Sequence, residues 1–93
     1  MINRSLKKEY YKLVKLYFAY RNCYNFNYQR YSFFRNMIRY ITEISEPNFL
    51  RSIFNQLLEE DYFQVKEQNG KIFYKYNPYK KEDVIPDEIW IYF

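Results

Sequence analysis

The 93-residue chain has a formal net charge of +4 and no histidine, and aromatic side chains make up 25% of it. That length suits one domain with a modest core, and the single cysteine, Cys23, excludes an internal disulfide framework and a cysteine-based zinc site. Histidine is the commonest general base and metal ligand, and no nucleophile–base set is visible, so we expect a protein that is not an enzyme and needs no cofactor or metal.

The charge is unevenly placed along the chain. Residues 1–57 contain ten Lys or Arg and three acidic residues, a net charge of +7, whereas residues 58–93 contain five Lys and eight acidic residues, a net charge of −3. A basic body favours an anionic partner, although it also keeps a protein in solution. No signal-peptide pattern and no apolar run of membrane-spanning length is visible, so we expect a cytoplasmic protein without a membrane partner.

A first helix is expected over residues 5–21. Its apolar residues at helical spacing predict a buried stripe made of Leu6, Tyr10, Leu13, Val14, Tyr17 and Phe18. Lys8, Lys12 and Lys15 follow one another at i, i+4 and i+7 on the opposite side. Such a row can lie along a phosphate backbone, or it can simply be a solvated face.

The pattern then fails up to Tyr28, where asparagines alternate with aromatic residues, and a loop is expected. The mixture of Arg and aromatic side chains could stack unpaired bases, but packing beneath the loop is the preferred interpretation. A second helix is expected over residues 29–42. Its core stripe is Phe34, Met37, Ile38 and Ile41, and Arg35 and Arg39 lie one turn apart on its outer side.

A third helix is expected over residues 46–60. Ser45 or Glu46 can cap its start, and Pro47 suits its first turn because the missing N–H needs no partner there. Its apolar residues share one face and are Phe49, Leu50, Ile53, Phe54, Leu57 and Leu58. The opposite face carries Asn48, Arg51, Ser52, Asn55 and Gln56. Side chains of these types hydrogen-bond base edges and phosphates, but they also suit an ordinary solvated helix face.

A β-hairpin is expected over residues 62–77. Asn69-Gly70 predicts a two-residue type I′ turn, because that turn needs positive φ at both positions. The resulting cross-strand pairs are Gln68–Lys71, Lys66–Phe73, Val65–Tyr74 and Phe63–Tyr76. One face of the hairpin is then largely apolar, and the other carries Gln64, Lys66, Gln68, Lys71, Phe73 and Lys75.

The remaining residues, 79–93, form an acidic tail that ends on aromatic side chains, among them Trp90, Tyr92 and Phe93. An apolar terminus tends to leave water. We therefore expect this segment to fold back as a strand, to cover the core or to form a dimer seam, and these three residues are the candidates for contact with a protein partner.

The stretch from Phe49 to Pro78 resembles the winged helix-turn-helix of small transcriptional regulators. The resemblance is carried by FLRSIFNQLLEEDYF, followed by QVK and, after the turn, GKIFYKYNP. It covers roughly residues 29–78 and implies an α+β, mainly α fold, with three helices followed by a β-hairpin wing and the tail, in a single domain over residues 1–93. The family usually has Gly at the corner after its recognition helix, where this chain has Asp61.

The resemblance implies that the third helix enters the major groove of double-stranded DNA and that the wing tip touches phosphates or the minor groove, as in a transcriptional regulator. Bases would be read by Asn48, Arg51, Ser52, Asn55 and Gln56. Phosphates would be held by Lys8, Lys12, Lys15, Arg35, Arg39, Lys66 and Lys71. The alternative is a protein-interaction module on the same scaffold, such as a small viral or mobile-element protein that inhibits a host nucleic-acid enzyme in the manner of an anti-CRISPR protein.

Overall fold

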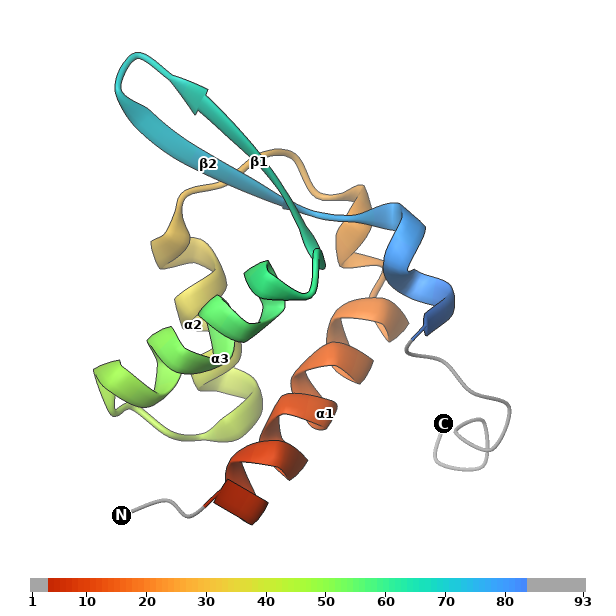
Figure 1. Cartoon of the computed structure of the whole chain (residues 1–93), viewed down its shortest axis with the longest axis vertical. Coiled ribbons are helices and arrows are strands. Elements are labelled where there is room, and N and C mark those ends of the chain that lie inside the picture. The colour runs from red at the N-terminus through yellow and green to blue at the C-terminus, as the bar shows by residue number, and fades with distance from the viewer. Residues whose placement is uncertain (1–3, 84–93) are drawn as a thin grey trace.

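Three helices are followed by a two-stranded hairpin, and this winged-helix-like layout confirms the expected α+β, mainly helical fold class (Figure 1). The computed structural model describes the backbone of residues 4–83 and the side chains of residues 7–80. The elements in chain order are α1 (Arg4–Tyr20), the 3-10 helix η1 (Cys23–Asn25), α2 (Tyr31–Thr42), α3 (Pro47–Glu59), β1 (Phe63–Gln68), β2 (Lys71–Tyr76) and the 3-10 helix η2 (Pro78–Asp83). The partner candidates Trp90, Tyr92 and Phe93 lie outside the described residues.

The start of α3 is capped as its sequence indicates. The carboxylate of Glu46 accepts hydrogen bonds from the backbone N–H of Asn48 at 2.9 Å and of Phe49 at 2.7 Å, and Pro47 is the first helical residue. These bonds satisfy two of the N–H groups that a helix start leaves without an intrahelical partner.

The end of α3 turns sharply into the hairpin. Asp61 has a φ of +63°, its N–H donates to the carbonyl of Leu58 at 3.1 Å, and the N–H of Tyr62 donates to the carbonyl of Leu57 at 2.9 Å. This pair of bonds is a Schellman motif, and its positive-φ residue lies where the winged-helix regulators that the sequence resembles usually have Gly. The side-chain amide of Asn77 then donates to the carbonyl of Asp61 at 3.0 Å, so the base of the hairpin is tied to the corner.

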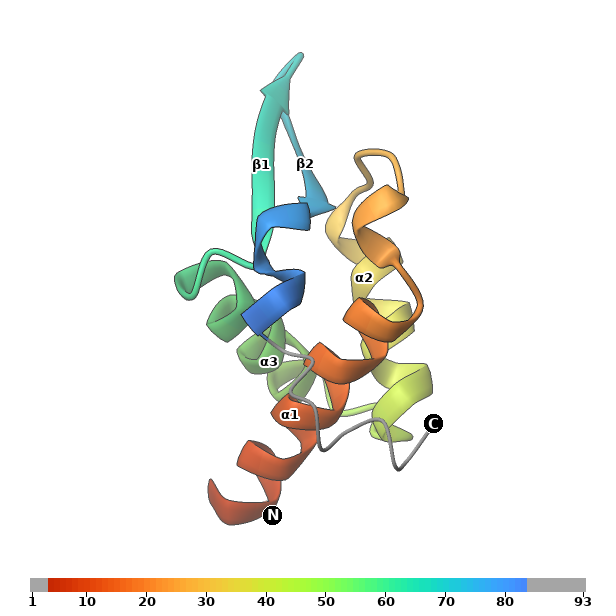
Figure 2. The ribbon, with the colours of Figure 1, turned by 90° about the vertical axis from the view of Figure 1, so that its right-hand side faces the viewer.

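The hairpin has the predicted register and turn. Phe63 pairs with Tyr76 and Gln68 pairs with Lys71, while Asn69 and Gly70 have φ values of +54° and +74°. Its apolar face is divided along its length: the side chains nearest the helices are buried, whereas those near the tip are exposed. The ribbon of the hairpin extends beyond the helices (Figure 2). The hairpin therefore projects from the body instead of lying flat against it.

The second helix begins two residues later than expected, because Gln29 belongs to the sheet. Its N–H donates to the carbonyl of Tyr74 at 2.8 Å, and its carbonyl accepts from the N–H of Tyr74 at 2.7 Å. This antiparallel bridge lies along the free edge of β2. It joins the loop before α2 to the wing, so that at Tyr74 the two strands are flanked by a third backbone segment.

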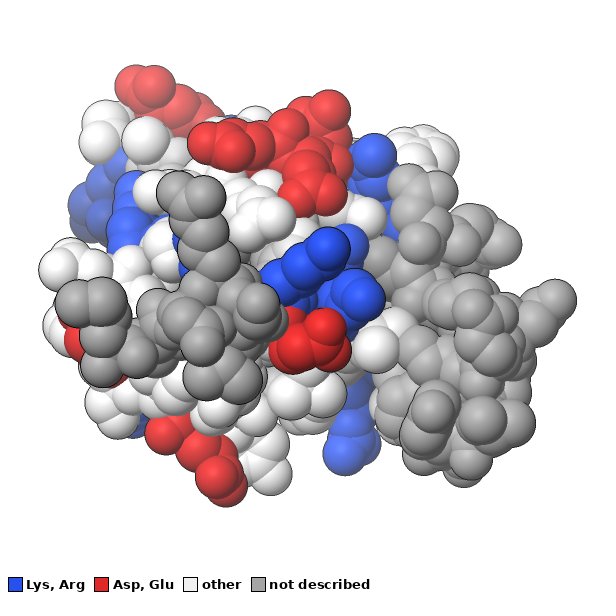
Figure 3. Space-filling model, turned by 60° about the horizontal axis from the view of Figure 1, so that its bottom comes forward, with Lys and Arg blue, Asp and Glu red and all other residues white. Residues whose placement is uncertain are grey.

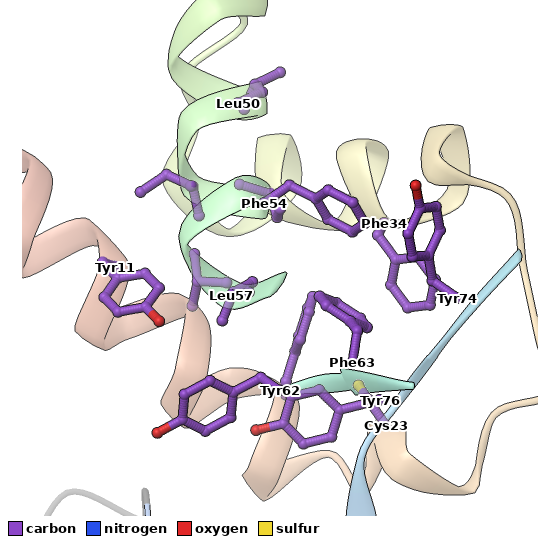
Figure 4. Packing of buried hydrophobic residues seen from close by; sticks show 14 of the residues in the cluster. Tyr11, Cys23, Phe34, Leu50, Phe54, Leu57, Tyr62, Phe63, Tyr74 and Tyr76 are labelled. Carbon is purple, nitrogen blue, oxygen red and sulfur yellow. The ribbon is translucent and has the colours of Figure 1, made fainter. Parts of the chain in front are cut away.

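One aromatic-rich core joins all these elements (Figure 4). Met37, Ile41 and Leu58, expected in the apolar stripes of α2 and α3, are half-buried at the edge of the core. The other expected members are buried, and these are Phe34, Ile38, Phe49, Leu50, Ile53, Phe54 and Leu57. Phe63, at the start of the hairpin, lies between the helices, with its ring centroid 4.7 Å from that of Phe34 and 4.9 Å from that of Phe54. The base of the wing is therefore part of the core.

The prediction for α1 was wrong in one respect, because the helix is rotated about its axis. Leu13, expected in the core, is 46% exposed, whereas Tyr11, expected on neither side, is 4% exposed. Phe18 decides the rotation: it is completely buried, and its ring contacts those of Phe34, Phe63 and Tyr76 at centroid distances of 6.3, 6.1 and 5.5 Å. Tyr17 packs against the core from its edge.

Candidate nucleic-acid interface

The polar side chains of α3 share one face, as predicted, but they are not equally available. Asn48, Arg51 and Asn55 are exposed, whereas Ser52 and Gln56 are half-buried. The hydroxyl of Ser52 donates to the carbonyl of Phe49 at 2.8 Å, and the amide of Gln56 donates to Glu60 at 3.3 Å. We call the face made by Asn48, Arg51, Ser52, Asn55 and Gln56 the α3 surface.

Arg51 lies at the edge of the α3 surface that faces α2. Its guanidinium carbon is 4.4 Å from the ring centroid of Tyr31 and 5.8 Å from that of Phe54. The two rings are themselves in edge contact, with centroids 4.9 Å apart. A guanidinium laid on an aromatic ring loses part of its rotational freedom while its donors stay available, so this cation is positioned before any ligand arrives.

A groove of about 600 Å³ separates the start of α2 from the hairpin tip. Its walls are formed by Arg30, Tyr31, Ser32, Gly70, Lys71, Ile72 and Tyr74. Tyr31 is thus shared between this groove and the ring contact with Arg51, which places two cations of the groove, Arg30 and Lys71, on the wing side of the α3 surface. Glu67 is the cross-strand partner of Ile72 and adds one negative charge nearby.

The other edge of the α3 surface is bounded by α1. A second hollow, of about 390 Å³, is lined by Lys7, Ser52, Asn55, Gln56, Glu59 and Glu60. Lys7 therefore places a positive charge beside the middle of α3, and the two glutamates place negative charges at its end. These charges favour an anion near the middle of α3 and disfavour one near its last turn.

The acidic end of α3 is also used internally. The hydroxyl of Tyr11 donates to the carboxylate of Glu60 at 2.7 Å. Burial, with the hydrogen bond and negative charge of Glu60 added to it, raises the pKa of Tyr11 well above its ordinary value. This bond fastens the middle of α1 to the end of α3.

The remaining predicted phosphate contacts are dispersed. Lys8 and Lys12 are exposed on α1, and Arg35 and Arg39 are exposed on α2, where helical spacing places them on one stripe with Ser32. Lys15 differs from its neighbours: its ammonium lies 4.6 Å from the ring centroid of Tyr11 and 5.4 Å from that of Tyr62.

Lys66 is also held on a ring, with its ammonium 4.7 Å from the ring centroid of Tyr28. This contact lies on the side of the hairpin that faces away from the core. The predicted set therefore does not form one continuous surface, and basic and acidic groups alternate over the face shown in Figure 3.

Two residues at the candidate interface were missed from the sequence, Lys7 and Arg30. Lys7 was one charge in a basic N-terminal segment, and only the crossing of α1 and α3 places it at the α3 surface. Arg30 was expected inside the second helix, whereas the structure places it just before α2, which begins at Tyr31 after the sheet bridge at Gln29. A single bridge leaves no repeating pattern in a sequence.

No group of three or more His, Cys, Asp or Glu within residues 4–83 is arranged to hold a metal ion. None of the helices among the same residues is long and apolar enough to cross a membrane. The thiol of Cys23 is buried, and burial raises its pKa to about 11.

No family model, no curated protein and no solved structure matches the chain.

Proposed function

We propose that this protein binds double-stranded DNA through the α3 surface, with the hairpin as a second contact, and acts as a regulator of transcription. The observation that carries the proposal is the placement of Arg51. It stands at the junction of the α3 surface and the groove that leads to Lys71 at the wing tip.

Each part of this arrangement has a role in the proposed contact. Asn48, Arg51 and Asn55 are exposed on the first three turns of α3, and side chains of these types can form paired hydrogen bonds with the edges of purines in the major groove. Lys7 and Lys71, at the two sides of the α3 surface, would hold phosphates and set the register of the helix on the duplex. The acidic last turn would then point away from the backbone.

Replacing Arg51 with Ala tests the proposal. We expect binding to a preferred duplex to weaken by about 1–3 kcal/mol, with relaxed discrimination at one base pair, measured by fluorescence anisotropy on sequences selected from a random library. Lys71→Ala should instead weaken binding to all duplexes alike and lower the salt slope by about one unit.

The matched control is Arg21→Ala. Arg21 is an exposed arginine that also lies over aromatic rings, with its guanidinium carbon 5.6 Å from the ring centroid of Tyr17 and 6.0 Å from that of Tyr20, but it follows the last residue of α1. Its replacement should leave duplex binding unchanged. Equal losses in the two variants, or no duplex binding by the wild-type protein at low salt, would refute the proposal.

A second candidate function is protein binding, and one observation favours it. Leu13, Tyr20 and Tyr40 are 46%, 45% and 76% exposed on α1 and α2, and the ring of Tyr40 lies at the edge of Tyr17 with centroids 6.5 Å apart. Tyrosine is among the residues that most often dominate protein interfaces. The surface suits a protein partner or a second copy of the chain.

Tyr40→Glu separates this candidate from the first. Light scattering over a range of concentrations would show whether the wild-type protein forms a dimer that the variant does not. A wild-type chain that binds no duplex but dimerises through Tyr40 would favour the interaction module. A variant that stays in the wild-type oligomeric state and binds duplex DNA normally would count against it.

A further inference from the structure

The hairpin has an outer face, which is directed away from the core. Alternation along the strands places the side chains of Gln64, Lys66, Gln68, Lys71, Phe73 and Lys75 on it, directed away from the core. Glu67, the only acidic residue of the two strands, belongs to the opposite face. These six positions therefore carry three positive charges and no negative one.

The bridge at Gln29 widens this outer face. Residues directly opposite one another in an antiparallel pair point to the same side, so Gln29 shares the inner face with Tyr74. Its neighbours Tyr28 and Arg30 therefore point outwards, beside β2. Arg30 raises the charge of the outer face to +4, and Tyr28 adds a second aromatic ring to that of Phe73.

The charges and rings of the outer face are in contact. The ammonium of Lys66 lies 4.7 Å from the ring centroid of Tyr28 and 6.0 Å from that of Phe73, and the guanidinium carbon of Arg30 lies 5.8 Å from that of Phe73. Both rings are half-buried, which fixes their positions. The cations are thus held above a partly exposed aromatic platform.

This combination favours one kind of ligand. Four cations on a face that carries no acidic side chain among the described residues attract a polyanion, and the aromatic rings favour its single-stranded form. The bases of a duplex are already paired and stacked, whereas unpaired bases can stack on Phe, Tyr and Arg. We propose that the outer face of the hairpin, centred on Arg30, Lys66 and Phe73, is a binding surface for a single-stranded nucleic acid. Arg30 and Lys71 also line the groove beside the α3 surface, whereas Lys66 and Phe73 belong to the outer face alone. Binding of a single strand at Lys66 and Phe73 therefore does not depend on duplex binding at the α3 surface.

Binding can be measured with a fluorescent oligodeoxythymidine of about 12 nucleotides, which neither folds nor pairs with itself, and with an oligouridine of the same length. We expect the wild-type protein to bind at low salt. Lys66→Glu should weaken binding at least about tenfold, because it reverses the charge at the centre of the platform. Arg21→Glu reverses the charge of another ring-held cation, outside the outer face, and should have no effect.

Phe73→Leu tests the stacking contribution, since it keeps an apolar side chain but removes the ring. It should weaken binding to the oligonucleotide about 5- to 150-fold, the loss of one base–ring stack, and leave affinity for a mixed-sequence duplex unchanged. Should this variant fail to fold, Lys66→Glu and its control still decide the question.

Three results would overturn the proposal: no oligonucleotide binding by the wild-type protein at low salt, equal losses in Lys66→Glu and Arg21→Glu, or equal losses of duplex and single-strand affinity in a folded Phe73→Leu protein. Duplex binding that is insensitive to Arg51→Ala would contradict the proposed function. The single-strand site is tested by the oligonucleotide titrations alone.

Discussion

At the scale of single residues, two backbone positions favour glycine but hold acidic residues. Glu43, after α2, and Asp61, after α3, have φ values of +60° and +63°. Residues with a Cβ adopt this conformation at a cost, although Asp tolerates it better than most. Both helices thus end with some backbone strain that the surrounding hydrogen bonds offset.

Asp61→Gly should therefore stabilise the protein, by several tenths of a kcal/mol up to about 1 kcal/mol. Urea unfolding of the two proteins measures the difference. Glu59→Gly is the control, because it introduces the same residue at the last helical position of α3, where it should destabilise by up to about 1 kcal/mol. Destabilisation by Asp61→Gly would mean that the carboxylate matters more to this corner than the backbone conformation does.

Gly70 is a position with positive φ that does hold glycine. Its φ is +74°, and a Cβ added there would meet no atom within 4 Å, so any cost of substitution comes from the backbone alone. We expect Gly70→Val to lower the free energy of unfolding by about 1 kcal/mol or more, because β-branched residues are strained at positive φ. Gly70→Asn should cost less. A thermal melt unchanged by valine would contradict the type I′ turn.

At the scale of elements, α3 is the helix on which the core depends most. Ile53 and Leu57 are completely buried. Replacing either with Ala should lower the free energy of unfolding by about 2–5 kcal/mol in urea titrations. Leu13→Ala makes the matched comparison on α1: with 46% of that residue exposed, the change should cost less than about 1.5 kcal/mol. Similar losses of unfolding free energy in Leu13→Ala and Leu57→Ala would instead support the rotation of α1 that the sequence predicts.

The contrast between these helices shows what the sequence could predict. In α3 the apolar residues occupy one face and the polar residues the other, so only one rotation buries a core. Tyr10, Leu13 and Tyr17 form one helical stripe of α1, and Tyr11, Val14 and Phe18 form another. Both stripes suit a buried face by composition, and only the fit of Phe18 among the rings of α2 and the hairpin decides between them. The hairpin was predictable because Asn69-Gly70 sets its turn and register locally.

At the scale of the whole molecule, the candidate surfaces are joined by a single core. The α3 surface lies on the face of α3 opposite to its core residues Ile53, Phe54 and Leu57. The aromatic platform lies on the face of the hairpin opposite to its core residue Tyr74. The sequence showed which cations exist but not which aromatic rings they contact. Arg51 contacts Tyr31 and Lys66 contacts Tyr28, and each pair joins residues from different elements. Contacts of this kind depend on tertiary packing and leave no local pattern.

The buried thiol of Cys23 reports on how this core opens. Cys23 is 0% exposed, at the junction of α1 and the short helix η1, and burial raises its pKa to about 11, so a disulfide reagent at pH 8 should react only after the site opens. If the core opens as one unit, the opening free energy from the labelling rate should equal the unfolding free energy from urea. Ile53→Ala, on α3, should then accelerate labelling about 30-fold for each 2 kcal/mol that it costs. Labelling that is fast and insensitive to Ile53→Ala would show instead that η1 opens locally while α2, α3 and the wing stay folded.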